Sequence, residues 1–179
     1  DQYDNYLSAA GWSVLSGSGL KGQGYLTSES GKVLFGDGQL YQGDAPVEFS
    51  LASDFAAQGL LAVGTSPEGE RTLALTFRGT DDEDGWDAAL GQSYTGNGIY
   101  HYYEAMRPLI NAALSYANDA DNGIDKMIVS GHSLGGATAD MFTLVDAHRL
   151  DESVDLTVVA LASPGLHPQA LLDGYQARG

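Results

Sequence analysis

Short, almost entirely apolar runs recur from the middle of the chain onward. They occupy residues 58–64, 71–77, 127–130 and 156–162. Such runs, with few polar interruptions, are typical of strands that are buried on both faces of a sheet. The connection between the first two runs contains a proline and a glycine, which predicts a hairpin.

Two segments between the later runs show helical spacing instead. Apolar residues recur every three to four positions across 102–117 and again across 135–150, which predicts a helix in each segment. The resulting order of apolar strands and helices predicts an α/β fold with a mostly parallel sheet and helices on both faces.

The first 58 residues give weaker signals. Residues 4–15 fit a short helix and residues 32–35 fit a short strand, whereas residues 46–58 fit either a strand or a helical turn. Residues 1–45 are rich in Gly, Ser and Tyr, so we interpret this part as a surface layer.

Composition limits the possible functions more than it limits the fold. The 179 residues suit one domain spanning the whole chain. The net charge of −16 argues against binding to nucleic acid or to an anionic bilayer. No apolar run has the length of a membrane span. The absence of cysteine excludes disulfides and thiolate metal sites.

The strongest motif is Gly-His-Ser-Leu-Gly at residues 131–135, which fits the pattern G-x-S-x-G with Ser133 at its centre. It lies between a predicted strand and a predicted helix, as a nucleophile elbow requires. In such an elbow the flanking glycines allow strand and helix to approach closely, and the serine hydroxyl projects beside helix N–H groups. An ordinary Gly-rich loop is the alternative, which the strand and helix on either side make less favourable.

Two further motifs end other predicted strands. Phe-Arg-Gly-Thr occupies residues 77–80, and Ala-Ser-Pro occupies residues 162–164. With the elbow, these motifs resemble those of the class 3 lipases of the α/β-hydrolase fold, and the resemblance extends over about residues 59–164. In closer detail the chain is similar to bacterial secreted lipases that carry C-terminal calcium-binding repeats, although no such repeat occurs in this sequence.

The resemblance implies roles for three residues. Ser133 matches the nucleophile, and Thr80 matches the oxyanion-hole residue, which offers its backbone N–H and its hydroxyl. Leu134 matches the second oxyanion donor through its backbone N–H. The resemblance therefore implies a secreted lipase or esterase that forms an acyl-enzyme, uses no cofactor for the chemistry and acts on a lipid or other ester at a lipid–water interface.

The acidic residues after Ser133 fit the triad poorly. A hydrolase triad runs serine, acid, histidine along the chain. Two acids lie on the helix after the elbow, and three precede the next strand, roughly 20 Å from its carboxyl end; they are Asp140, Asp146, Asp151, Glu152 and Asp155. We therefore do not expect any of them to be the triad acid.

The histidines fit no better. His167 follows the last predicted strand but precedes Asp173, which reverses the required order. We therefore expect the triad acid and base beyond Gly179, in a C-terminal part of the domain that this chain lacks. The alternative is a non-catalytic fragment or binding module that keeps the lipase fold without its triad acid and base.

Residues 81–98 correspond to the lid of the lipases that the chain resembles. Glycines near both ends and the apolar Trp86 and Leu90 between them predict a segment that opens at a lipid surface; a fixed loop with Trp86 buried is the alternative. The acidic residues from Asp81 to Asp87 allow a structural calcium, but they lack the spacing of a calcium loop, which favours a solvated lid hinge.

The remaining candidate residues are interpreted as structural. For His132 we favour packing over chemistry, because its side chain alternates away from Ser133, and for His101 and His148 we expect surface or helix-end positions. We expect Arg78 to form a buried ion pair. Three tyrosines fit either an acyl-binding wall or, more favourably, core packing; they are Tyr100, Tyr102 and Tyr103.

Overall fold

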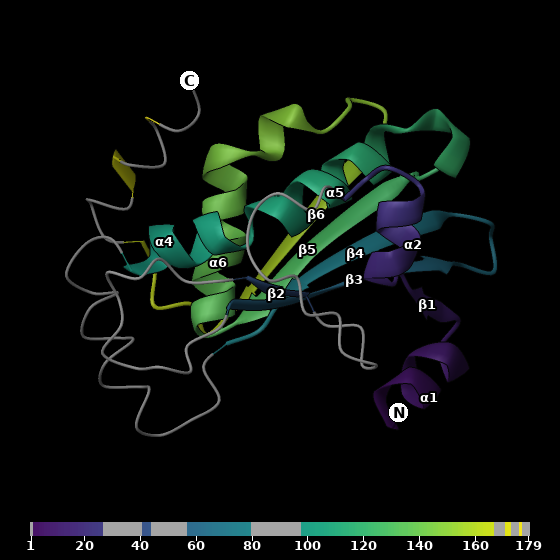
Figure 1. The fold of residues 1–179 in the computed structure, drawn as a ribbon, viewed down its shortest axis with the longest axis horizontal. Coiled ribbons are helices and arrows are strands. Elements are labelled where there is room, and N and C mark those ends of the chain that lie inside the picture. The colour runs from purple at the N-terminus through teal and green to yellow at the C-terminus, as the bar shows by residue number, and fades with distance from the viewer. Residues whose placement is uncertain are drawn as a thin grey trace.

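A computed structural model describes residues 2–26, 41–43, 57–79, 98–166, 171–172 and 176. Its strands form one six-stranded sheet in the order β1-β3-β4-β5-β6, with β2 also paired with β3. The strands are β1 (Trp12–Val14), β2 (Tyr41–Gly43), β3 (Ala57–Thr65), β4 (Arg71–Phe77), β5 (Lys126–His132) and β6 (Asp155–Leu161). The predicted α/β fold is confirmed, since helices alternate with strands in the second half of the chain (Figure 1). The sheet was expected to be mostly parallel, but it is mixed, with three antiparallel and two parallel pairs among the described strands.

Most of the helices contribute to one hydrophobic core on a single face of this sheet, so the expected cover of both faces by helices is not found among the described residues (Figure 1). The helices are α1 (Gln2–Ala9), α2 (Gly17–Gly22), α4 (Gly98–Ala105), α5 (Arg107–Asn118) and α6 (Leu134–Val145), with short 3₁₀ turns η2 (Ala120–Asn122) and η3 (Ala147–Arg149). In Figure 1, α4 and α6 lie toward one end of the molecule and α1 lies toward the other.

Strand pairing divides the sheet into two parts. β3 and β4 form the predicted hairpin, in register from Gly59 opposite Phe77 to Thr65 opposite Arg71. β1 and β2 both pair antiparallel with β3. In contrast, β4, β5 and β6 are parallel, so their carboxyl ends meet at one end of the sheet, where parallel α/β sheets place their functional sites.

One face of the sheet forms the main core. Leu75 and Phe77 of β4 and Val129 of β5 are at most 1% exposed. The helix α5 packs closely on this face: a Cβ atom on Gly59 would lie 2.8 Å from Cδ2 of Leu109 in α5 and 2.4 Å from Cε of Met106, its N-cap residue. The other side chains of the core strands alternate with these and are half-buried, as the two-residue period of a strand requires.

The single helix predicted over 102–117 is wrong. The chain forms α4 and α5 instead, separated at Met106. Pro108, at the start of α5, has no N–H, and its ring would clash with the carbonyl of Glu104 in a continuous helix. The proline therefore ends one helix and begins the next.

Other boundaries also differ from the predictions. The helix predicted over 135–150 ends at Val145 and continues as the 3₁₀ turn η3. The helix predicted over 4–15 is α1 followed by strand β1, and the left-handed Gly11 (φ 80°) lies between them. The strand predicted at 32–35 and the lid at 81–97 lie outside the described residues.

Candidate active site

The carboxyl ends of β4 and β5 and the first turn of α6 converge on Ser133. Phe77, the last residue of β4, pairs with Gly131 of β5. Ser133 follows β5 directly and is the N-cap residue of α6. The three elements that the sequence predicted around the elbow are therefore adjacent in space.

Ser133 has an unusual backbone conformation for a residue with a side chain. Its φ is 55° and its ψ is −123°, a combination that costs about 1–3 kcal/mol unless the surrounding structure imposes it. The backbone N–H of Ser133 donates to the carbonyl of Leu161 at 2.9 Å, and its carbonyl accepts from Ala137 at 3.1 Å. These bonds hold the turn from both sides, and the Ser133 side chain forms no capping bond to α6.

Glycines allow the backbones around Ser133 to touch. A Cβ atom on Gly131 would lie 2.1 Å from the carbonyl oxygen of Gly135, and one on Gly135 would lie 2.3 Å from the carbonyl oxygen of Phe77. A Cβ atom on Gly79 would lie 2.6 Å from the carbonyl oxygen of His132. No side chain fits at any of these positions, so the glycines are a geometric requirement of the turn.

Leu134 is the first residue of α6 and is 2% exposed. The backbone N–H groups in the first turn of a helix have no partner within the helix, and they favour negative charge. The carbonyl of Leu134 is fixed by a 2.8 Å bond from the hydroxyl of Thr138. Leu134 therefore occupies a position from which its N–H can act as an oxyanion donor. Thr80 lies outside the described residues.

The strand end that leads to Thr80 is held by a tyrosine. The hydroxyl of Tyr102 in α4 donates to the backbone carbonyl of Arg78 at 2.6 Å. Tyr102 is 5% exposed and Tyr103 is fully buried, so the expected core packing is confirmed for both. The Arg78 side chain is exposed, so the expected burial of its ion pair is wrong.

The end of β6 packs against the start of α6. Ala162 has a positive φ of 48°, and the hydroxyl of Ser163 donates to the carboxylate of Asp140 in α6 at 2.6 Å. A Cβ atom on Gly136 would lie 3.0 Å from the carbonyl oxygen of Leu161. Asp140 is therefore engaged in holding the third strand end beside the elbow.

Comparison with known proteins assigns this arrangement to a family. The family model "Lipase (class 3)" matches residues 62–176. The chain belongs to the class 3 lipase family. The matched region includes β4, β5, β6 and the elbow.

A solved structure titled "Crystal structure of M37 lipase" is similar to this chain. The TM-score is 0.52 and the sequence identity is 14%, and the match covers 92% of this chain and 49% of the M37 lipase chain. The similarity supports the fold, and this chain spans about half the length of that protein. No curated protein matches the chain.

The acids that follow Ser133 in this class 3 lipase chain are far from it or already engaged. Asp146 follows the last residue of the 12-residue helix α6, which places it roughly 18 Å from the elbow at 1.5 Å per residue. Asp155 begins β6 at its amino end, and Asp151 accepts hydrogen bonds from Ser153 in the preceding turn, which lowers the pKa of Asp151. The prediction that these acids lie at the wrong end of the sheet is confirmed.

The histidines whose side chains are described are not placed to act as the general base. His132 is exposed, so the expected packing role is wrong: the side chain leaves β5 on the solvent side. His148 is exposed in η3, as expected of a surface residue. His167 and Asp173 lie outside the described residues.

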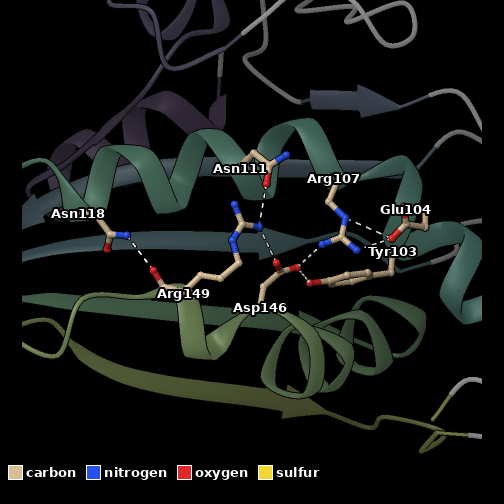
Figure 2. Close-up of polar contacts among 7 residues, drawn as sticks. All are labelled: Tyr103, Glu104, Arg107, Asn111, Asn118, Asp146 and Arg149. Carbon is tan, nitrogen blue, oxygen red and sulfur yellow. Dashed lines mark hydrogen bonds and ion pairs between the residues drawn. The ribbon is translucent and has the colours of Figure 1, made fainter. Parts of the chain in front are cut away.

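A buried charged network, which the sequence did not reveal, lies at the far end of α6 (Figure 2). Asp146 is 1% exposed and accepts bonds from Arg107 and Arg149, both at 2.6 Å. Figure 2 shows the two arginines reaching Asp146 from opposite sides. The hydroxyl of Tyr103 also donates to Asp146, and Glu104 pairs with Arg107 at 2.5 Å.

The environment of the network keeps its members in the required protonation states. Burial, the charge of Asp146 and the hydrogen bond to Asp146 raise the pKa of Tyr103, so it remains a phenol that donates to the carboxylate. Burial alone would lower the pKa of Arg107, but its hydrogen bond to Glu104 and the charge of Asp146 raise it. The network therefore joins α4, α5 and the end of α6 through fixed charges.

Two features are absent from the described part of the chain. It contains no group of three or more histidine or acidic side chains that could hold a metal ion. It also contains no helix that is long and apolar enough to cross a membrane. The acidic residues for which we considered calcium, 81–87, lie outside it.

Proposed function

We propose that this chain is the part of a carboxylic ester hydrolase, a lipase or esterase, that carries the nucleophile Ser133. The observation that supports this most directly is the Ser133 turn itself. A serine at φ 55° and ψ −123°, only 5% exposed and closed in by three glycine contacts, is a strained and costly arrangement. Such strain is typical of a nucleophile elbow.

In the proposed reaction the Ser133 hydroxyl gives its proton to the general base and its oxygen attacks the ester carbonyl. The alcohol leaves with that proton, and water then hydrolyses the acyl-enzyme to the free acid and restores the serine hydroxyl. The negative charge that develops on the carbonyl oxygen is stabilised by the N–H of Leu134 and by that of Thr80. Thr80 follows Gly79 in the chain. An ideal Cβ atom placed on Gly79 would lie 3.4 Å from Cβ of Ser133. The general base and its acid lie, in this proposal, outside the described residues.

The proposed substrate is a lipid or other ester met at a lipid–water interface, outside the cell. Family membership supports this substrate class, and the net charge of −16 favours an uncharged interface over an anionic one. Acyl-chain length and head group depend on pocket residues, because fold alone does not define a substrate.

Labelling with a fluorophosphonate, which reacts with activated serines, tests the assignment. We expect the complete enzyme, which carries the triad acid and base as well as this chain, to be labelled at Ser133 and its Ser133→Ala variant to remain unlabelled. The matched control is Ser130→Ala in β5, three residues earlier, whose hydroxyl bonds Thr76 at 3.0 Å; this variant should be labelled like the wild type. Peptide mapping identifies the modified residue. Absence of labelling in the wild type would support the non-catalytic binding module instead.

A further inference from the structure

Two residues other than glycine have a positive φ in the described part of the chain, and they lie close together. They are Ser133 at 55° and Ala162 at 48°. The backbone N–H of Ser133 donates to the carbonyl of Leu161, the residue before Ala162, at 2.9 Å. A positive φ is unfavourable for a residue with a Cβ atom, so it persists only where the surroundings impose it. Both turns therefore depend on contacts that hold them in place.

Asp140 of α6 holds the turn at Ala162. Its carboxylate accepts from the hydroxyl of Ser163 at 2.6 Å, and the same hydroxyl oxygen accepts from the N–H of Gly165 at 3.1 Å. The Ser163 hydroxyl thus gives its only proton to Asp140 and accepts from the turn that follows. A hydrogen bond to a carboxylate is about twice as strong as a neutral one. Ala162 therefore lies between two fixed neighbours, the Leu161 carbonyl on the elbow and the Ser163 side chain on α6.

A close packing contact lies between these two hydrogen bonds. An ideal Cβ atom on Gly136, in the first turn of α6, would lie 3.0 Å from the carbonyl oxygen of Leu161 and 3.3 Å from Cβ of Ser163. The end of β6 thus lies against the first turn of α6, and the bond to Asp140 in the second turn keeps it there. Loss of that bond lets the strained turn after β6 relax, and the carbonyl that holds the elbow belongs to this turn.

We propose that Asp140 is a positioning residue for the nucleophile, acting through Ser163 and the Leu161 carbonyl on the backbone of Ser133. This inference rests on the proposed function of Ser133. It goes beyond that function, because Asp140 lies roughly 10 Å along α6 from the serine at 1.5 Å per residue and acts on it through the end of β6. Its role is to keep the serine oxygen aligned for attack, where a displacement of about 1 Å is enough to lower the rate ~10²-fold.

The test removes each partner of the hydrogen bond in the complete enzyme. We expect Asp140→Ala and Ser163→Ala each to lower the rate constant of fluorophosphonate labelling at Ser133 about 10-fold, and kcat/KM for a soluble p-nitrophenyl ester by a similar factor. The double variant should be no slower than the slower single variant, because both substitutions break the same bond. Asp140→Asn keeps an amide oxygen that can accept from Ser163, so its rate constant should recover to within about threefold of the wild type.

The same two residue types at the other end of β6 give the matched control. Asp151 accepts from the hydroxyl of Ser153 at 2.7 Å in the turn before β6, roughly 20 Å from the carboxyl end of that strand. Asp151→Ala and Ser153→Ala also remove a carboxylate and a hydroxyl that bind each other, and they should keep the wild-type rate constant. A labelling rate constant does not depend on the amount of folded protein, so lower stability of a variant does not imitate the expected result.

The outcomes separate this inference from the proposed function. A complete wild-type enzyme that the probe does not label would overturn both. If the wild type is labelled and both Asp140→Ala and Ser163→Ala react at its rate, the role of Asp140 alone is wrong. The inference is also wrong if the two effects add in the double variant, or if Asp151→Ala slows labelling equally, because neither result depends on the bond between Asp140 and Ser163. Where Asp140→Ala does not fold, the rate constant of Ser163→Ala decides alone.

Discussion

The two ends of α6 are built by different means. At its amino end, backbones touch through Gly131 and Gly135, and Ser133 is held in a strained turn. At its carboxyl end, Asp146 is enclosed by two arginines and a tyrosine (Figure 2). One end is defined by the absence of side chains and the other by a cluster of charged ones.

The difference follows from what each end must do. The proposed role of Ser133 as nucleophile requires an oxygen that projects beside free N–H groups, so bulky side chains and competing hydrogen bonds are unsuitable there. The far end has no such requirement, and it can fix the orientation of α6 against α4 and α5 through ion pairs. The elbow therefore depends on backbone geometry, whereas the packing of α6 against α4 and α5 depends on buried charge.

The largest expected effect comes from adding one methyl group at the amino end. In Gly131→Ala the new Cβ would lie 2.1 Å from the carbonyl oxygen of Gly135, and Gly135 cannot retreat because it is packed against Phe77. We expect a loss of more than about 4 kcal/mol, which is a large share of the roughly 5–15 kcal/mol by which a typical domain is stable. Urea unfolding followed by circular dichroism measures it.

Gly22→Ala is the matched control for this substitution. A Cβ atom on Gly22 would meet nothing within 4 Å, and the residue has no positive φ. Because Gly22 lies in α2, where alanine is more favourable than glycine, the unfolding free energy of the variant should rise by about 0.5–1 kcal/mol and should not fall. Equal unfolding midpoints for the two alanine variants would show that the elbow tolerates side chains, and the contrast between the two ends of α6 would then be wrong.

A smaller but still large effect is expected at the carboxyl end. Asp146→Ala leaves Arg107 and the hydroxyl of Tyr103 without their buried partner, so we expect a loss of about 3 kcal/mol. The labelling rate of Ser133 per folded molecule should stay unchanged, because roughly 18 Å of helix separates the two sites. Thermal unfolding and the labelling assay measure the two quantities separately.

Glu152→Ala is the control for the lost charge. Glu152 is an exposed acid in the turn before β6, so its removal should change the unfolding free energy by less than about 0.5 kcal/mol. Should Asp146→Ala be as stable as Glu152→Ala, the network would be a surface-like ion pair and would not fix α6.

The sequence predicted the amino end of α6 far better than the carboxyl end. The residues that specify the elbow are neighbours in the sequence: an apolar run, two glycines around Ser133 and a helical period follow one another within about twenty residues. The strand pairing around it follows from the same runs. Leu134, which the family resemblance assigned as an oxyanion donor, is the first residue of α6, and its role as a donor stays a prediction.

The network at the other end could not be predicted in the same way. Asp146 and Arg107 are 39 residues apart along the chain, and their pairing depends on how α5 lies against α6. The break between α4 and α5 was readable, since Pro108 stands inside the helical pattern. The Tyr102 bond to Arg78 spans 24 residues and likewise depends on tertiary packing, which a hydrophobic pattern does not specify.

The smallest predicted effect tests whether strain is stored at Ser133. Both Ser133→Gly and Ser133→Ala remove the hydroxyl of the proposed nucleophile, but only glycine adopts φ 55° and ψ −123° without steric cost. The relieved strain of about 1–3 kcal/mol exceeds the roughly 0.5–1 kcal/mol by which glycine is ordinarily less favourable than alanine. We therefore expect the glycine variant to be more stable than the alanine variant by about 1 kcal/mol, in urea unfolding.

The same pair of substitutions at Ser130 should give the opposite order. Ser130 lies within β5, where the backbone is extended, so a glycine there relieves no strain. The Ser130→Gly variant should therefore be less stable than the Ser130→Ala variant by the ordinary difference of roughly 0.5–1 kcal/mol. A reversal of sign over three residues is a signature that neither hydrophobicity nor side-chain volume produces, because both pairs exchange the same atoms. If alanine were favoured at Ser133 as well, the turn would be unstrained, and the amino end of α6 would differ from the carboxyl end only in its lack of charge.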